Sequence, residues 1–213
     1  TRAAALTGVL QGELRAEAGQ PFGEATLACC RDLIMSGEPD KAVELCDLAL
    51  SRLSSNSEEW KLRVLIVRAR ALMNASHFEG SMQAISKLMQ EFDGVVQKIP
   101  DEWATVRIVR AANDWQMNRA SEAVDELLSV RRELLSRPDS YLLGWCSYQL
   151  AAAETMRGNY EVARRYATDA LVSSRRCGNP HLEALALCVT AMRERALCRW
   201  ASALECDEEA DRI

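Results

Sequence analysis

The stretch Arg157–Leu171, RGNYEVARRYATDAL, joins a turn to the start of a helix. Gly158 and Asn159 favour a turn, and the residues that follow them favour a helix. Ala163 and Ala170 lie seven residues apart, so they fall on one face of that helix. Small side chains on one face allow a second helix to approach closely. The stretch therefore predicts half of a helical hairpin.

The same arrangement recurs along the chain. A turn is followed by a bulky or turn-forming residue, two further positions, a small residue and, seven residues later, another small or apolar residue. The small residues that set the register, named the anchors here, are Ala42, Ser81, Ala123, Ala163 and Ala203. They are separated by 39, 42, 40 and 40 residues, a period typical of proteins built from repeated helical units.

A second small residue lies twelve positions before each anchor. These five upstream residues are Cys30, Ala69, Ala111, Ala151 and Ala191. Two antiparallel helices joined by a tight turn approach best where both present a small side chain. Each anchor is therefore expected to face its upstream residue, as Ala163 would face Ala151.

Caps and breakers predict the ends of the helices. They indicate a helix at 2–18 and then five helix pairs, at about 22–53, 57–97, 101–137, 139–177 and 180–213. The second helices of these pairs are expected to begin at Pro39, Phe78, Ala120, Tyr160 and Trp200, and the first helix of the last pair is expected to end at Cys198. Pro100, Pro138 and Pro180 each fall just before or at the first helix of a pair, where a missing N–H costs least. No segment has the alternation of a β-strand. The prediction is an all-α protein of about eleven helices, stacked as an α-solenoid in a single domain over 1–213.

Composition excludes several classes of protein. The chain is 48% hydrophobic and 27% charged, with a net charge of −5 and no basic stripe, so we expect no direct binding of nucleic acid. No apolar run approaches the roughly 20 residues of a membrane span, and no signal peptide is visible, so we expect a cytoplasmic protein away from membranes. The chain begins with Thr1 rather than Met, and we expect it to be a fragment of a larger protein.

Residues with catalytic or ligand-binding chemistry are sparse and dispersed. The eight cysteines follow no regular spacing, and we expect reduced thiols that act as small hydrophobic side chains. A zinc site needs clustered ligands, whereas His77 and His181 are far apart. No G-x-S-x-G, H-E-x-x-H or G-x-G-x-x-G motif occurs. We therefore expect no enzymatic activity, no catalytic residues, no metal and no cofactor.

Gly158, Tyr160, Ala163 and Ala170 match the signature positions of the tetratricopeptide repeat. The resemblance covers about residues 22–213, although the period here is near 40 residues, against the usual period of about 34. The longer phrase ALVSSRRCGNPHLEALAL, residues 170–187, resembles the sensor regions of the maltose-regulon activator and related ATP-dependent LuxR-type regulators. The resemblance implies a right-handed solenoid. It also implies a non-catalytic protein–protein interaction scaffold that serves as the sensor or docking segment of a bacterial signalling or transcription regulator.

The first helices of stacked pairs line the concave side of such an array. Aromatic and arginine residues expected on that side form the predicted partner site, which consists of Arg31, Arg70, Trp115, Trp145, Tyr148 and Arg195. The partner would be a protein or peptide. The alternative is a small-molecule inducer bound in the concave groove, and a homo-oligomer also remains open. A competing interpretation places the aromatic residues in the core and pairs the arginines with surface glutamates.

Enlarging either partner of a hairpin contact is expected to weaken the fold. Ala163→Leu and Ala151→Leu should each lower the free energy of unfolding by roughly 1–3 kcal/mol, because extra methylene groups overpack a close contact. Urea unfolding measures this loss. A neutral result for either variant would show that the hairpin register is wrong.

Overall fold

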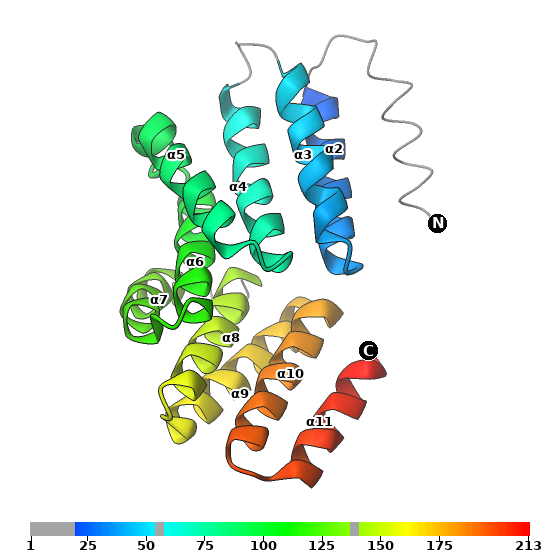
Figure 1. Cartoon of the computed structure of the whole chain (residues 1–213), viewed down its shortest axis with the longest axis vertical. Coiled ribbons are helices and arrows are strands. Elements are labelled where there is room, and N and C mark those ends of the chain that lie inside the picture. The colour runs from blue at the N-terminus through cyan, green and yellow to red at the C-terminus, as the bar shows by residue number, and fades with distance from the viewer. Residues whose placement is uncertain (1–19, 54–57, 137–140) are drawn as a thin grey trace. The chain divides into compact units, whose positions relative to one another are not determined.

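The structure, a computed structural model, describes residues 20–53, 58–136 and 141–213 (Figure 1). In these ranges the regular secondary structure is helical throughout, which confirms the predicted all-α fold. The ten described helices are α2 (Gln20–Met35), α3 (Pro39–Arg52), α4 (Glu58–Asn74), α5 (Phe78–Val96), α6 (Pro100–Gln116), α7 (Ala120–Leu134), α8 (Tyr141–Met156), α9 (Tyr160–Cys177), α10 (Pro180–Ala196) and α11 (Trp200–Asp211). The helix predicted at 2–18 lies outside the described residues.

Helix ends agree closely with those predicted from caps and breakers. The second helix of every pair begins at the predicted residue, and α9 also ends at the predicted Cys177. One difference is the end of α10, which stops at Ala196 rather than at Cys198. The reason is local, because Cys198 has a positive φ of 59°, which an α-helix does not accommodate.

The helices gather into two compact units, and the boundary between the units falls within α6. The first ends at Val106, and in it α2 packs on α3 and α4, α3 on α4, and α4 on α5 (Figure 1). The second runs from Arg107 to Ile213, and in it α8 packs on α7, α9 and α10, while α10 also packs on α9 and α11. In both units a second helix thus contacts its own partner and the first helix of the next pair. The single domain and the right-handed solenoid stay predictions.

All five hairpin turns share one backbone geometry. The residue five positions before each anchor has a positive φ, and these residues are Gly37 (77°), Ser76 (62°), Asn118 (64°), Gly158 (79°) and Cys198 (59°). The N–H of each donates to the carbonyl three residues back, and the next N–H donates to the carbonyl five residues back, at 2.8–3.3 Å. This is the Schellman arrangement, which satisfies carbonyls that a helix end otherwise leaves without donors.

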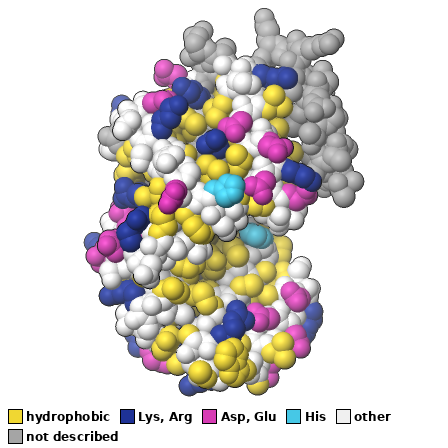
Figure 2. All heavy atoms as spheres, viewed as in Figure 1, with side chains coloured by type: hydrophobic (Ala, Val, Ile, Leu, Met, Phe, Trp, Pro, Cys, Tyr) yellow, Lys and Arg dark blue, Asp and Glu magenta, His cyan; other side chains and the backbone are white. Residues whose placement is uncertain are grey.

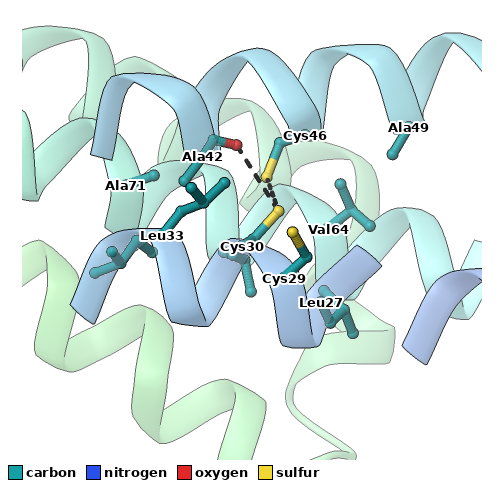
Figure 3. Packing of buried hydrophobic residues seen from close by; sticks show 11 residues of the cluster. Leu27, Cys29, Cys30, Leu33, Ala42, Cys46, Ala49, Val64 and Ala71 are labelled. Atoms are coloured by element: carbon teal, nitrogen blue, oxygen red, sulfur yellow. Dashed lines mark hydrogen bonds between the residues drawn. The ribbon is translucent and has the colours of Figure 1, made fainter. Parts of the chain in front are cut away.

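The anchors and their upstream residues are all buried, and none is more than 2% exposed. In the second hairpin, the Ser81 hydroxyl donates to the Ala69 carbonyl at 2.7 Å. In the first, the Cys30 thiol lies 3.8 Å from the Ala42 carbonyl oxygen, toward which it points (Figure 3). The predicted facing of anchor and upstream residue is confirmed by direct contact in these two hairpins. In the other three, both residues are buried alanines.

The core of the first unit surrounds the contact between α2 and α3. The sulfur atoms of Cys30 and Cys46 lie 3.5 Å apart among Leu27, Leu33 and Val64 (Figure 3). The hydrogen bond between the two thiols and their burial raise the pKa of Cys46 far above its ordinary value, which keeps this group a neutral thiol. All eight cysteines lie in the described residues, where they are free cysteines.

Helices of the second unit approach closely at Gly144 on α8. A Cβ atom at this position would lie 2.8 Å from Leu182 Cδ2 on α10 and 2.9 Å from Ser173 Cβ on α9. Only glycine therefore leaves room for both neighbouring helices. Around this point, Trp145, Leu150 and Leu182 are at most 2% exposed.

Charged side chains inside the second unit are paired. Arg107 on α6 is 8% exposed and donates to Glu126 at 2.5 Å and to Glu133 at 2.6 Å, both on α7. Arg193 on α10 is 4% exposed and donates to the Tyr160 carbonyl at 2.8 Å. Because a buried charge without a partner is costly, these pairs favour one arrangement of the helices over others.

Strain at the hairpin turns is expected to depend on the residue with positive φ. Gly158→Ala should lower the free energy of unfolding by about 1 kcal/mol, because the left-handed conformation costs an L-residue roughly that much. Ser76→Gly should raise it by a smaller amount, since glycine removes the strain but adds freedom to the unfolded chain. Urea unfolding measures both changes.

Gly94→Ala in α5 serves as the control. Gly94 also has nothing within 4 Å of a built Cβ, but it lies inside a helix without a positive φ. Alanine is expected to stabilise there by about 0.5–1 kcal/mol. Equal effects at Gly158 and Gly94 would contradict the role of the turn.

Candidate functional site

The six residues of the predicted partner site divide between the two units. Arg31 on α2 is exposed and Arg70 on α4 is half-buried, and both belong to the first unit. Trp115, Trp145, Tyr148 and Arg195 belong to the second. The six therefore do not come from one packed unit, and four of them lie in the second unit.

The two tryptophans of this set are core residues. Trp145 is 2% exposed and stacks on Tyr141 of the same helix, with 6.2 Å between ring centroids. Trp115 is 9% exposed, and its indole N–H donates to Gln149 Oε1 on α8 at 2.8 Å. A buried indole normally finds such a partner. The prediction that these rings face a partner is corrected in favour of the competing core interpretation.

Tyr148 remains at the border between core and surface. Its side chain is half-buried on α8, one turn beyond Trp145. Burial raises the pKa of the Tyr148 phenol to about 12, and the nearby Cys188 and Tyr141 add to the rise. The phenol is therefore neutral at pH 7 and acts as a hydrogen-bond donor with an apolar ring, which is typical of residues at protein interfaces.

Cys188 occupies the position on α10 that Tyr148 occupies on α8, because the two lie one period of 40 residues apart. Partial burial of the sulfur raises the pKa of Cys188, the carboxylates of Asp207 and Asp211 raise it further, and Arg195 opposes them. Arg195 donates to Asp207 Oδ2 at 2.6 Å. Cys188 and Arg195 are both exposed on α10.

Figure 2 shows hydrophobic side chains gathered over the part of the molecule that α8 to α11 form, with charged groups between and around them. Two large apolar residues of α11 are well exposed, namely Trp200 at 64% and Leu204 at 58%. Sequence reasoning used Trp200 only as the residue that opens the helix. The available signal was the spacing, since Trp200 and Leu204 lie one turn apart and Leu204 does not fall on the face that Ala203 buries.

The described residues hold no group of three or more His, Cys, Asp and Glu side chains that could bind a metal ion. His77 is exposed in the turn between α4 and α5, and His181 lies in the first turn of α10. Among the described helices, none is long and apolar enough to cross a membrane. The candidate site is a surface of helices, on which Arg195 of α10 pairs with Asp207 of α11.

Comparison with known proteins gives a fold and no family. No family model matches the chain, and no curated protein sequence matches it. The crystal structure of BtubC (BKLC) from P. vanneervenii is similar, with a TM-score of 0.64 and 15% sequence identity over 99% of this chain and 88% of that chain. This likeness supports the all-α fold and carries no argument about a ligand or partner. The resemblance to tetratricopeptide repeats and to the regulators stays a prediction.

Tryptophan fluorescence is expected to separate the exposed ring from the buried rings. Iodide should quench mainly Trp200, and Trp200→Phe should remove most of the quenchable emission. Trp200 is 64% exposed, whereas the other four tryptophans are half-buried or buried. Trp145→Phe should leave the quenchable part unchanged. A large loss of quenching in Trp145→Phe would place that ring at the surface.

Proposed function

We propose that this chain is a non-catalytic scaffold that binds a protein or peptide partner through its helical hairpins. One observation carries the proposal: five hairpins repeat the same turn and the same small contacts, while the residues on their outer surfaces differ from one to the next. A repeated backbone with variable side chains provides an extended recognition surface without a catalytic centre.

The surface that we assign to the partner includes Tyr148 on α8, with Cys188 and Arg195 on α10. Tyrosine and arginine contribute strongly to interfaces. The buried Trp145 and Gly144 lie one turn before Tyr148 on the same helix, so the backbone that carries the tyrosine is tightly packed. A rigid support lowers the entropy that is lost when a side chain is immobilised on binding.

The alternative function is a receptor for a small-molecule inducer. It requires the three predicted aromatic residues, Trp115, Trp145 and Tyr148, to line the groove. Two of the three are core residues and offer no ring face to a ligand. We therefore favour the macromolecular partner. The narrower role in a bacterial signalling or transcription regulator, the absence of enzymatic activity and the cytoplasmic location stay predictions.

Site-specific photocrosslinking tests the proposal. A benzophenone amino acid at Tyr148 is expected to form an adduct of discrete mass in cells that encode the protein, whereas the same group at the exposed Glu122 of α7 should not. The adduct partner is then purified, and calorimetry measures its binding. Tyr148→Ala should weaken it by about 1 kcal/mol or more, the scale of an interface hot spot.

Tyr148→Phe serves as the matched control because it keeps the ring and its packing. If Tyr148→Ala lowers thermal stability and leaves binding intact, Tyr148 is only a core residue. If native mass spectrometry instead finds a small molecule that Tyr148→Ala releases, the inducer receptor replaces the scaffold.

A further inference from the structure

The last helix carries an exposed stripe that the packing of the second unit leaves uncovered. Within this unit α11 packs on α10 (Figure 1), and its buried residue is Ala203. Trp200, Leu204, Glu208 and Asp211 follow each other at steps of three or four residues and so lie along one side of the helix. All four are exposed. We name them the α11 stripe.

Ion pairs between successive second helices show which side of each helix faces the next. Arg131 on α7 donates to Asp169 on α9 at 2.7 Å, and Arg175 on α9 donates to Glu209 on α11 at 3.4 Å. Asp169 and Glu209 both lie six residues after their anchors, so they are equivalent positions. In each pair the earlier helix supplies the arginine and the later helix supplies the acid.

The repeat register identifies the residue of α11 that is equivalent to Arg131 of α7. Arg131 lies eight residues after Ala123, and the residue eight positions after Ala203 is Asp211. The side of α11 equivalent to the side of α7 that meets the next pair therefore presents a carboxylate in place of an arginine. The charge at this position is reversed relative to α7, and α9 has the uncharged Leu171 there.

Leu204 of the stripe has equivalent residues on other second helices. Leu204 directly follows its anchor, and so do Val43 on α3 and Val124 on α7. Val124 is 2% exposed, and Val43 packs against the core cluster of the first unit. On α9 the equivalent residue is the exposed Arg164. It is charged and pairs with Glu161, so its exposure to solvent costs little. Leu204 has the character of the covered valines but is 58% exposed.

We propose that the α11 stripe docks a basic amphipathic helix of a partner protein. The apolar side of that helix covers Trp200 and Leu204, and its lysine or arginine residues meet Glu208 and Asp211. Helix-in-groove recognition of this kind places apolar anchors at steps of three and four residues. This inference extends the surface of the proposed function, since Asp211 raises the pKa of Cys188, and it does not involve Tyr148.

Charge argues against a second copy of the chain as the occupant. Two copies of α11 would bring like charges together, because the helix carries five acids, of which Asp207, Glu209 and Glu208 pair with Arg195, Arg175 and Arg212 and none pairs with a basic residue of α11 itself. Like charges at an interface disfavour association.

The test uses two designed helical peptides of about 18 residues, long enough to hold a helix. Both carry leucine at helical spacing, and the remaining positions are lysine in one peptide and glutamate in the other. Fluorescence anisotropy measures their binding to the full chain. We expect the lysine peptide to bind more tightly than the glutamate peptide, and its affinity to fall as salt rises.

Two variants assign the binding to the stripe. Leu204→Glu and the charge reversal Glu208→Lys with Asp211→Lys should each weaken binding of the lysine peptide by about tenfold or more. The charge reversal should also improve binding of the glutamate peptide. The matched control, Glu122→Lys with Asp125→Lys on the exposed surface of α7, makes the same change of charge and should alter affinity less than about twofold.

Three outcomes of the peptide-binding and sedimentation measurements would overturn the inference. The first is equal weakening by the stripe and control variants, which would show non-specific attraction. The second is equal binding of the two peptides. The third is a dimer in sedimentation that Leu204→Glu converts to a monomer, which would make a second copy the occupant.

Thermal unfolding confirms that each variant is folded, and all altered side chains are exposed. If a partner crosslinks at Tyr148 but the lysine peptide does not bind at α11, this inference is wrong and the proposed function still holds.

Discussion

The five described hairpins each bury a pair of small side chains where their two helices meet, and in two of the hairpins these residues are in direct contact. The turn places the two helices side by side, and the residue with positive φ reverses the chain without adding length. A larger side chain at the contact would hold the helices apart over their whole length. Where the small residue is polar, it bonds to the backbone opposite, as Ser81 does to Ala69 and as Cys30 does, more weakly, to Ala42. A polar group can thus replace alanine there without being left unsatisfied.

Because the helices of a hairpin touch at small residues, the large residues pack mainly between successive hairpins. Trp145 is buried on α8, a helix that contacts α7, α9 and α10. Gly144 beside it leaves room for two of these neighbours. Buried arginines also link elements, as Arg193 of α10 does when it donates to the backbone at the start of α9. A first helix enclosed in this way keeps few side chains for recognition, which is why Tyr148 is the half-exposed aromatic near its middle.

The same packing rule determines which surface of the second unit is available to a partner. The second helices α7 and α9 each meet the next second helix through an arginine, Arg131 or Arg175, which pairs with an acid of that helix. In α11 this side is apolar at Trp200 and Leu204 and acidic at Glu208 and Asp211. In the proposed docking, these acids attract a partner of opposite charge. Helix packing and the proposed recognition therefore draw on the same few positions.

The sequence by itself determined the local architecture. The period of the anchors, the upstream small residues and the caps predicted the described helices to within a few residues, and they predicted the contact between Ser81 and Ala69. These features are local, because a hairpin contact joins residues twelve positions apart across one turn. Turn chemistry was less visible, since Ser76 and Cys198 take a conformation usually reserved for glycine.

The tertiary structure decided which side chains are core and which are surface. Trp145 and Trp200 are both tryptophans near the start of a helix, yet one is 2% exposed and the other 64%. The difference arises because α8 lies among three other helices, while within its unit α11 packs on α10. Burial of a residue depends on helices that lie tens of residues away in the chain, and the period alone does not say which of them cover it.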